Sequence, residues 1–286
     1  MQENISILTP DALSKRDQLV NLIINRLNEA ERSLQRQFLE SVGDVGVRYC
    51  FVDDLLPEKT AQSIYDVFPD VDSMRLMKSF REQKYTSKSF EKFNPLMGDI
   101  TFAIQDPRVV AVIERITGIK NQIPDEHLYA GGLSVMGRDH FLGPHIDNSH
   151  DSDRIYYRTL NLLYYVSPDW KRENGGNLEL WDKSVRRHVT IDSKFNRLAI
   201  METNPWSWHS VSKIGVERLR YCISNYYFSA VSPIGRDYFN VTSFSARPEQ
   251  KVRRALAWVD NRLRQAVRVV VPQGVGKKDI YEGSVK

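Results

Sequence analysis

Gly143-Pro144-His145-Ile146-Asp147-Asn148 is the stretch from which the fold and the chemistry of this chain can be predicted. In a β-strand, successive side chains point to opposite faces, so residues two positions apart share a face. His145 and Asp147 can therefore direct an imidazole and a carboxylate to one point, while Ile146 packs on the other side. The Gly143-Pro144 turn is expected to start this strand. A His-X-Asp pair is common by itself, so its interpretation depends on residues further along the chain.

A second imidazole is available from His209, which follows the tryptophan-rich turn Pro205-Trp206-Ser207-Trp208. Two histidines and one carboxylate on one face of a metal suit a non-haem Fe(II) that must leave positions open for other ligands. The sequence therefore predicts that His145, Asp147 and His209 are the metal ligands of an oxygenase. A three-histidine zinc site is the alternative, but a spacing of five suits neither face of a strand. Its candidate ligands are His140, His145 and His150.

An arginine opens the last predicted strand of the β-rich segment, which covers residues 220–228 and is otherwise strongly apolar. Arg220 shares a face with Cys222 and Ser224, and a buried guanidinium is costly unless a carboxylate pairs with it. A dicarboxylate cosubstrate would supply that partner in bidentate geometry, with one end on the metal and the other on Arg220. A salt bridge to a protein acid and an outward-facing Arg220 remain open, and Arg218 is a rival for the same role.

The bulk composition is that of an ordinary soluble globular protein. The 286 residues, of which 27% are charged and 10% aromatic, can bury a substantial core. The two cysteines, Cys50 and Cys222, have no metal-like spacing, which argues against a disulfide scaffold and favours a reducing compartment. The chain has no signal-type N-terminus and no apolar run that could span a bilayer, so a cytoplasmic protein without a membrane partner is expected.

The chain divides into three predicted regions that are expected to form one structural domain. Residues 1–124 are a helical support region, in which a long helix is expected from an N-cap at Thr9 to about Val42, ended by Gly43. A charged stretch at residues 79–92 lacks periodicity and is expected to be a loop over the site. Asp106 and the proline after it should start another helix, which ends near Gly118.

Residues 125–230 are β-rich and residues 231–286 are a helical extension. Short strands separated by polar turns predict a sandwich or jelly roll rather than βαβ units. The extension carries Val252, Leu256, Val259, Leu263 and Val267 along one helix face. It is also rich in arginine and lysine, although the formal net charge of the chain is only +4. A solvated helix face explains this basic run better than an acidic partner.

Several motifs, in one order over residues 128–228, resemble the Fe(II)/2-oxoglutarate-dependent dioxygenases, and within them the prolyl-4-hydroxylase-like branch. The resemblance is carried by His145-Ile146-Asp147, Arg158-Thr159-Leu160-Asn161-Leu162-Leu163-Tyr164-Tyr165, Asp169-Trp170, Gly175-Gly176-Asn177-Leu178-Glu179-Leu180-Trp181, His209 and Arg220-Tyr221. It implies an α+β protein with a double-stranded β-helix core, of jelly-roll or cupin-like type, and flanking helices. It also implies that Fe(II) is held by His145, Asp147 and His209.

The resemblance further implies that 2-oxoglutarate chelates the iron through its keto-acid end. Its far carboxylate would pair with Arg220 and accept a hydrogen bond from the Tyr165 hydroxyl. A tyrosine that is common in that branch ten residues before the first histidine is Val135 here, so one hydrogen bond to the cosubstrate is expected to be absent or replaced. The other expected neighbours of the cosubstrate are Asn161, Leu163, Val211 and Ser224.

With O2 as the third reactant, the implied reaction is hydroxylation of an unactivated C–H bond in an amino-acid, peptidyl or other small-molecule substrate, with release of succinate and CO2. Asp147 favours hydroxylation over halogenation, because the related halogenases have a small residue in its place. The expected substrate contacts are Arg158, Tyr226 and His150.

Two other functions are weighed against hydroxylation. A nucleic-acid demethylase of the same superfamily would suit the basic extension, but Ser224-Asn225-Tyr226 stands where those enzymes carry a second arginine, so a nucleic-acid partner is not expected. A non-catalytic, cupin-like metal-binding protein is the other alternative. The sequence leaves the substrate and the oligomeric state open.

Overall fold

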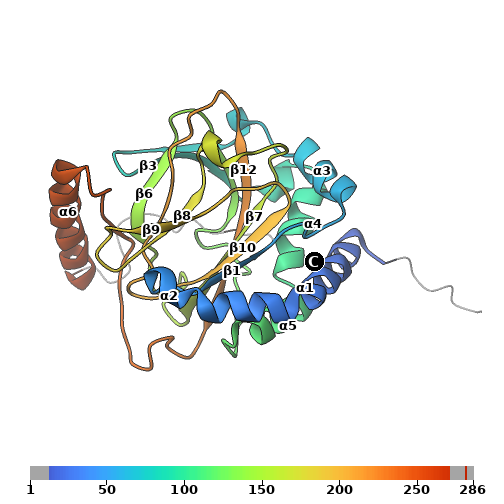
Figure 1. Cartoon of the computed structure of the whole chain (residues 1–286), viewed down its shortest axis with the longest axis horizontal. Coiled ribbons are helices and arrows are strands. Elements are labelled where there is room, and N and C mark those ends of the chain that lie inside the picture. Colours follow the sequence, from blue (N-terminus) through green and yellow to red (C-terminus); the bar gives the residue numbers. More distant parts are fainter. Residues whose placement is uncertain (1–12, 271–280, 282–286) are drawn as a thin grey trace, which may run out of the picture.

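The β-rich segment forms a curled antiparallel sheet at the centre of the molecule, with helices around it (Figure 1). The computed structural model describes residues 13–270 and 281. Its strands are β1 (Tyr49–Val52), β2 (Arg75–Lys78), β3 (Glu82–Ser87), β4 (Ile123–Pro124), β5 (Gly132–Met136), β6 (Phe141–Ile146), β7 (Tyr157–Tyr165), β8 (Leu178–Trp181), β9 (His188–Ile191), β10 (Arg197–Glu202), β11 (His209–Val211), β12 (Arg220–Ser229) and β13 (Ser243–Phe244). Its helices are α1 (Lys15–Glu40), α2 (Val42–Val45), α3 (Glu58–Asp66), α4 (Pro95–Ile104), α5 (Pro107–Thr117) and α6 (Lys251–Val270), with short 3₁₀ turns at Val71–Ser73, Phe90–Lys92 and Arg172–Asn174.

Neighbouring strands along the sheet follow the order β1-β10-β7-β12-β5-β3-β6-β11-β8-β9. Three further strands pair outside this path, with β13 on β6, β2 on β3 and β4 on β12. Because the sheet curls back on itself, β7, β10 and β12 lie opposite β6, β8 and β11 (Figure 1). This arrangement is the predicted double-stranded β-helix, and it leaves an interior between two layers of strands.

The two longest strands, β7 and β12, are buried on both faces. Their antiparallel register places alternate residues toward the interior, as the period of two requires. The paired interior residues are Cys222 with Tyr165, Ser224 with Leu163, and Tyr226 with Asn161. The residues between them face the helices, so one pair of strands serves both the site and the main hydrophobic core.

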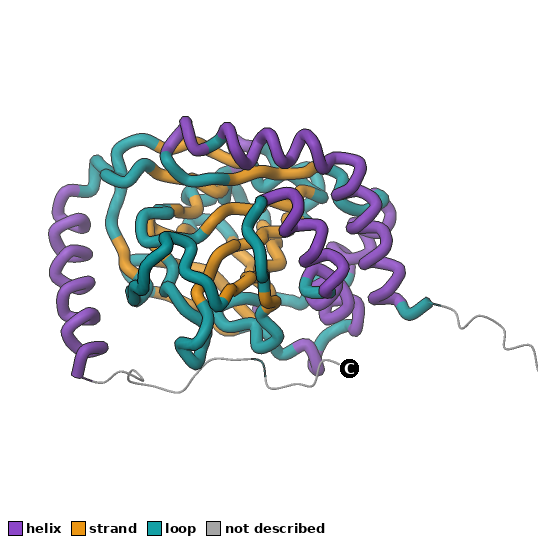
Figure 2. Tube along the Cα trace, turned by 90° about the horizontal axis from the view of Figure 1, so that it is seen from below, coloured by secondary structure: helices purple, strands orange, loops and turns teal. Residues whose placement is uncertain are grey.

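The main hydrophobic core lies between β7, β12 and the helices α1, α4 and α5. Helix α1 begins after Ser14, whose hydroxyl accepts a hydrogen bond from the Asp17 backbone N–H (3.1 Å). Its recurring apolar residues are fully buried against that core: Leu19, Val20, Ile23, Leu27, Leu34 and Phe38. Figure 2 shows these helices wrapped along one side of the strands. Burial of apolar surface on one side of the sheet thus fixes β7 and β12 in place.

Two local expectations need correction. The stretch at residues 79–92 is not a loop over the site, because it contains β3 and forms a hairpin with β2. Gly143 and Pro144 lie inside β6 rather than in a turn before it, and the Gly143 N–H donates to the Arg81 carbonyl (2.8 Å). A side chain at Gly143 would lie 3.1 Å from that carbonyl oxygen, so the close approach of the two chains favours glycine.

The helix boundaries agree in part with those predicted from the sequence. The expected N-cap at Thr9 lies outside the described residues, and Gly43 falls within α2, which ends at the left-handed Gly46 (φ +79°). Helix α5 has the predicted cap at Asp106 and the predicted end at Gly118. The division into residues 1–124, 125–230 and 231–286 stays a prediction. Among the described helices, none combines the length and the apolar character needed to cross a membrane.

Candidate metal site

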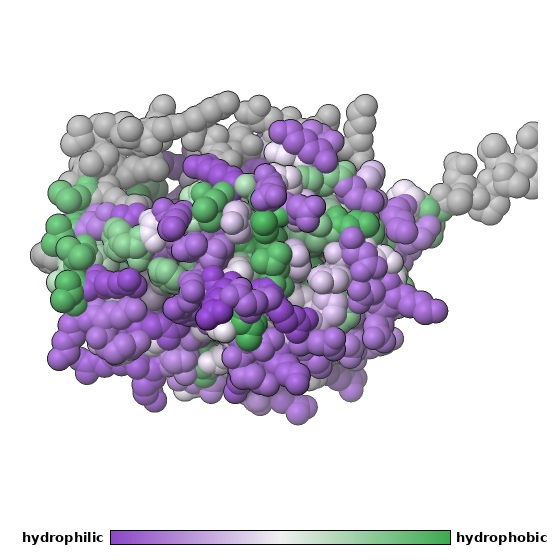
Figure 3. Space-filling model, turned by 90° about the horizontal axis from the view of Figure 1, so that it is seen from above, coloured by the Kyte–Doolittle hydropathy of each residue, from purple (hydrophilic) through white to green (hydrophobic). Residues whose placement is uncertain are grey.

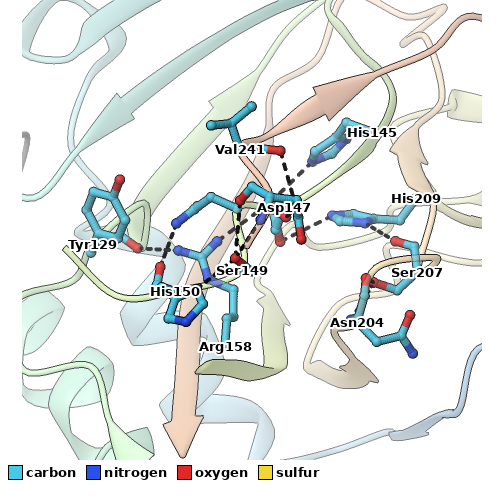
Figure 4. Close-up of polar contacts among 12 residues, drawn as sticks. Tyr129, His145, Asp147, Ser149, His150, Arg158, Asn204, Ser207, His209 and Val241 are labelled. Carbon is cyan, nitrogen blue, oxygen red and sulfur yellow. Dashed lines mark hydrogen bonds and ion pairs between the residues drawn. The ribbon is translucent and has the colours of Figure 1, made fainter. Parts of the chain in front are cut away.

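His145 and His209 lie side by side because β6 and β11 pair antiparallel and place these two residues directly opposite each other. Their rings are 4.0 Å apart, and Asp147 follows immediately after β6. The Asp147 Oδ1 is 3.6 Å from His145 Nε2, and its Oδ2 is 3.6 Å from His209 Nε2. Figure 4 shows both imidazoles pointing at this carboxylate. The structure therefore brings together the three residues that the sequence singled out.

Backbone carbonyls fix the orientation of both rings. His145 Nδ1 lies 3.0 Å from the Gly143 carbonyl, and His209 Nδ1 lies 3.0 Å from the Ser207 carbonyl. A carbonyl oxygen only accepts, so each Nδ1 donates, and in a neutral ring this leaves Nε2 as the ligand atom directed at the shared point. The turn before His209 is itself held by Ser207, whose hydroxyl bonds both the N–H and the carbonyl of Asn204 (2.9 Å each).

The charges at this site suit a cation. Burial opposes ionisation of Asp147, but His209, His145 and Arg158 hold the pKa of its carboxyl well below the usual range. Burial, together with the neighbouring His145, lowers the pKa of His209 to about 4. The resulting set is an anionic carboxylate beside a neutral imidazole, the protonation state that a divalent metal requires.

A metal fits these three residues on the evidence of their own atoms. Asp147 Oδ2 is buried and has no hydrogen-bond donor within the described part of the chain. The ligand atoms of His145, Asp147 and His209 all lie within 4.8 Å of one another. One carboxylate and two imidazoles on one side form the donor set expected for a non-haem Fe(II).

Arg158, predicted as a substrate contact, lies behind Asp147 (Figure 4). Its side chain is fully buried, its Nη1 is 3.7 Å from Asp147 Oδ1, and its Nη2 donates to the Tyr129 carbonyl (3.2 Å). The guanidinium also lies over the Tyr226 ring, 4.0 Å from the centroid. Arg158 is not part of the wall of the adjacent cavity, whereas Tyr226 is. The ion pair with Asp147 holds this buried cation next to the metal ligands.

A cavity of about 280 Å³ opens from the triad into the interior of the curled sheet. All three triad residues line it, together with most of the residues predicted to contact the cosubstrate. Those predicted residues are Asn161, Leu163, Val211, Arg220 and Ser224. His150 lies outside the described wall, where its Nδ1 contacts the Ser149 hydroxyl (2.7 Å) and its ring packs on Tyr157.

Arg220 points into this cavity, and neither alternative for it is found. Its Nε donates to the Gly176 carbonyl (3.1 Å), and its side chain is almost fully buried. Among the residues that the structure describes, no acid forms an ion pair with it. Its guanidinium lies 5.0 Å from the centre of the Tyr165 ring. The rival Arg218 instead donates to the carbonyls of Pro168 and Asp169 at the surface.

Tyr165 lies next to Arg220 but is not part of the described wall of the cavity. Its hydroxyl is buried, and burial raises its pKa, so the phenol stays protonated. A guanidinium and a neighbouring phenol donor have the chemistry to bind a carboxylate.

Val135 belongs to the hydrophobic core and offers no hydrogen bond to the cavity, as expected. The residues of β5 that line the cavity are Gly132, Leu133, Ser134 and Met136. The cavity wall at this edge is completed from β3 by Glu82 and Lys84, which form an ion pair (3.1 Å). This pair was not predicted, because residues 79–92 were expected to form a loop. Alternation of residues along β3 was the signal that could have revealed it.

A segment after the last core strand closes the site from outside, and we call residues 240–247 the C-terminal strap. It pairs with β6 through β13, which places Phe244 opposite His145, and the two rings stack with centres 5.5 Å apart. Asn240 Nδ2 donates to the Asp147 carbonyl (2.8 Å). Thr242 and Phe244 also line the cavity. The strap was not predicted, because its residues form no recognisable motif.

The strap also contacts the strands that carry the second imidazole. Arg247 forms an ion pair with Glu179, a buried acid on β8. Glu179 accepts a hydrogen bond from the Ser210 hydroxyl (2.6 Å), and Ser210 directly follows His209. The Trp181 indole donates to the same hydroxyl (2.7 Å). Both metal-bearing strands therefore depend on polar contacts made by, or next to, the strap.

Comparison with known proteins gives one family match. Residues 131–228 match the model of the 2OG-Fe(II) oxygenase superfamily. No curated protein matches the chain.

Solved structures with similar folds include two prolyl hydroxylases. One is from Trichoplax adhaerens, in complex with a peptide fragment of the hypoxia inducible factor oxygen degradation domain. It shares 18% sequence identity with this chain, covers 75% of this chain and 91% of its own length, and gives a TM-score of 0.45. Another is a Pseudomonas putida prolyl-4-hydroxylase (13% identity, 68% of this chain and 98% of the other, TM-score 0.43). A third is HygX from Streptomyces hygroscopicus with nickel, 2-oxoglutarate and hygromycin B bound (13% identity, 68% and 87% coverage, TM-score 0.46).

Proposed function

Because residues 131–228 match the model of the 2OG-Fe(II) oxygenase superfamily, we propose that the chain hydroxylates an unactivated C–H bond of an amino-acid, peptidyl or other small-molecule substrate. As a 2-oxoglutarate-dependent oxygenase it would use Fe(II), 2-oxoglutarate and O2. The coproducts would be succinate and CO2. Asp147 supports hydroxylation rather than halogenation, since its carboxylate occupies the position that a halide would need.

The observation that carries the proposal is the convergence of His145, Asp147 and His209 on one point. The Asp147 Oδ2 at this point is buried and accepts no hydrogen bond from the described residues. These three residues would hold the iron. Fe(II), when bound, supplies the activation of O2 that couples oxidation of 2-oxoglutarate to oxidation of the substrate. The protein orients the ligands through the Gly143 and Ser207 carbonyls and buries them away from bulk water.

The second part of the proposal concerns the cosubstrate. Arg220 would pair with the far carboxylate of 2-oxoglutarate, and the Tyr165 hydroxyl would donate a hydrogen bond to it. The Arg220 guanidinium lies 5.0 Å from the centre of the Tyr165 ring. Among the described residues, no acid forms an ion pair with Arg220, whose Nε donates only to uncharged oxygens. The walls beside the chain of the cosubstrate would be formed by Asn161, Leu163, Val211 and Ser224.

Arg158 would keep Asp147 ionised and oriented, since it lies 3.7 Å from the carboxylate on the side away from the cavity. Tyr226 faces the cavity and would be the nearer substrate contact. Glu82 and Lys84 also lie on this wall, opposite charges that a substrate with polar groups could use.

The proposal is tested by release of succinate from 2-oxoglutarate by the iron-loaded protein, first alone and then with candidate amino acids, peptides and small molecules. We expect slow release alone and faster release with a substrate, and both should be lost in Asp147→Ala. An iron-loaded protein that never forms succinate would instead support the non-catalytic, cupin-like alternative. Undiminished succinate release by Asp147→Ala would refute the assignment of the ligands.

A further inference from the structure

Two buried charged residues lie near the metal site with incomplete hydrogen bonding. Hydrophilic side chains cover much of the face shown in Figure 3, where charged groups remain in water. Arg158 and Asp125 are instead only 1% and 5% exposed. Among the described residues, the Nε and Nη1 of Arg158 and the Oδ2 of Asp125 have no hydrogen-bond partner. Burial of such groups is costly, so the two charges are expected to stabilise each other.

The pairing of β4 with β12 brings Asp125 into the neighbourhood of Arg158. Pro124 is the last residue of β4 to pair with β12, and Asp125 follows it, level with Tyr226 on the neighbouring strand. The Arg158 guanidinium lies over the Tyr226 ring, 4.0 Å from its centre. Burial raises the pKa of Tyr226, and the carboxylates of Asp147 and Asp125 raise it further. Both acids therefore act on the region that holds this guanidinium.

The turn after β4 connects Asp125 to Arg158 a second time. The Asp125 carbonyl accepts hydrogen bonds from the Leu128 N–H and from Gln105 Nε2, both at 3.0 Å. At the end of this turn the Tyr129 carbonyl accepts a hydrogen bond from Arg158 Nη2 (3.2 Å; Figure 4). One short segment thus supplies Arg158 with a neutral acceptor and with a nearby carboxylate.

The ionised form of Asp125 depends on Arg158. Burial raises the pKa of Asp125 to about 6, so its carboxyl is ionised at neutral pH. The groups that oppose this rise are the Tyr129 N–H, then Arg158, and then Lys88 and His127. Arg158 is therefore the cation that stabilises this carboxylate most. Neither Asp125 nor Arg158 is part of the described wall of the cavity, so neither is placed to contact a substrate.

Metal binding changes the surroundings of Arg158. In the metal-free protein its Nη1 lies 3.7 Å from the Asp147 carboxylate, and no other acid of the described residues forms an ion pair with it. A divalent cation on Asp147 would compete with Arg158 for that carboxylate and would repel the guanidinium. We propose that Asp125 is a positioning residue of the metal site, whose carboxylate balances the charge of Arg158 when Asp147 binds the metal. This role rests on the proposed function, because it requires a metal held by His145, Asp147 and His209.

The first test is a Co(II) titration of the metal-free full chain, followed by visible absorption. Asp125→Asn removes the charge and keeps the size of the side chain, and we expect the Kd to rise at least about tenfold. The band positions of bound Co(II) should not change, because the ligands are the same. The matched control is Asp53→Asn, since Asp53 pairs with another buried arginine, Arg197, and neither lines the cavity. Its Kd should stay within about twofold of the wild type.

A second test asks whether the effect passes through Arg158. In the Arg158→Met background, Asp125→Asn should change the Kd less than about threefold, because the buried cation is gone. A purely structural role of Asp125 would give the same change in both backgrounds. If circular dichroism shows that Asp125→Asn is unfolded, Asp125→Ser, which also removes the charge, takes its place.

The pH dependence of the Kd provides a third readout. Because burial raises the pKa of Asp125 to about 6, its carboxyl becomes protonated below that pH, and the wild type comes to resemble Asp125→Asn. The ratio of the two Kd values should therefore decline from about pH 8 to about pH 5, since the metal ligands titrate alike in both proteins.

Three results would overturn this role of Asp125. They are an equal Kd for Asp125→Asn and the wild type at neutral pH, an undiminished effect in the Arg158→Met background, and a ratio of Kd values that does not change with pH. A wild type that binds no Co(II) would refute the metal site itself, and with it any positioning role, whereas the three results above leave the metal site in place.

Discussion

The two ends of the active-site cavity are supported in different ways. Arg220 and Tyr165, which would anchor 2-oxoglutarate, lie on β12 and β7, the two longest strands, whose outer face is covered by the main hydrophobic core. The metal ligands lie on or beside β6 and the three-residue β11, which depend on carbonyl contacts, on the C-terminal strap and on the Glu179 network. Apolar packing is non-directional, whereas each polar contact specifies a position. We therefore expect the core to determine global stability and the strap to determine the quality of the metal site.

The largest effect should come from the metal ligands themselves. Asp147→Ala removes the single anionic ligand, and loss of the metal costs several kcal/mol of transition-state stabilisation, at least about a thousandfold in turnover. Succinate release measures the loss. The melting temperature of the metal-free protein should fall as well, because the substitution leaves the buried Arg158 guanidinium without its carboxylate partner. An unchanged melting temperature would mean that this ion pair contributes nothing to the stability of the fold.

The reverse experiment targets the core behind the anchor strands. Leu27→Ala in α1 should lower the free energy of unfolding by about 2–5 kcal/mol, because Leu27 is fully buried. Urea denaturation measures this change. Metal affinity of the folded protein at 25 °C should stay within about twofold of the wild type. A large drop in that affinity would show that the two ends are not independent.

The cosubstrate anchor can be separated from its rival by a matched pair of variants. Arg220→Met should raise the KM for 2-oxoglutarate about 100-fold, since removal of one partner of a buried charge pair typically costs about 2–5 kcal/mol. Arg218→Met should leave the KM unchanged, because Arg218 bonds surface carbonyls. Initial rates at saturating iron provide both values. Equal effects of the two substitutions would contradict the assignment.

The metal end should also make the metal-free protein sensitive to acid. The pKa of His209 falls from its ordinary value of 6.5 to about 4 on folding, so the folded state binds its proton less readily than the unfolded state. Stability from this group is present above about pH 6.5 and declines as the pH falls toward 4, by about 2 kcal/mol at pH 5. Urea denaturation of the chelated wild type at pH 7.5 and 5 measures the decline. His209→Leu should show a smaller decline, and an identical one would contradict this origin.

The smallest predicted effect concerns the strap. Asn240→Ala removes the hydrogen bond to the Asp147 carbonyl. Hydrogen bonds made directly to a metal-ligating side chain typically contribute about tenfold or more to metal affinity. Because this contact is made to the backbone, we expect the metal Kd to rise only about three- to tenfold. Titration with Co(II), followed by its visible absorption, gives the Kd. Asn28→Ala, on α1 and remote from the site, is the control. An unchanged Kd would remove the strap from the metal site.

The sequence predicted what depends on local spacing. His145 and Asp147 share a direction because of strand alternation, and Arg220 faces inward with Ser224 for the same reason. The opposition of His145 and His209 is different, since it depends on the pairing of β6 with β11, which are separated along the chain by β7, β8, β9 and β10. Residue type alone made His209 a candidate ligand, and the resemblance to a known family supported it.

The strap and the hairpin of β2 with β3 were missed for a physical reason. β2 and β13 are short strands that pair with one neighbour each, and β3 is held between β5 and β6; none of the three has an apolar pattern of its own. Arg158 was predicted as a substrate contact, whereas the structure places it against Asp147 and outside the described wall of the cavity, a position that depends on tertiary packing.

The most direct test is anaerobic titration of the metal-free protein with Fe(II) and then 2-oxoglutarate, monitored for the visible charge-transfer absorption of their complex. The proposed site predicts a band that saturates at one iron per chain in the wild type, is absent in His209→Ala, and needs much more 2-oxoglutarate in Arg220→Met. A band of wild-type intensity in His209→Ala would contradict the claim that His145, Asp147 and His209 hold the iron together.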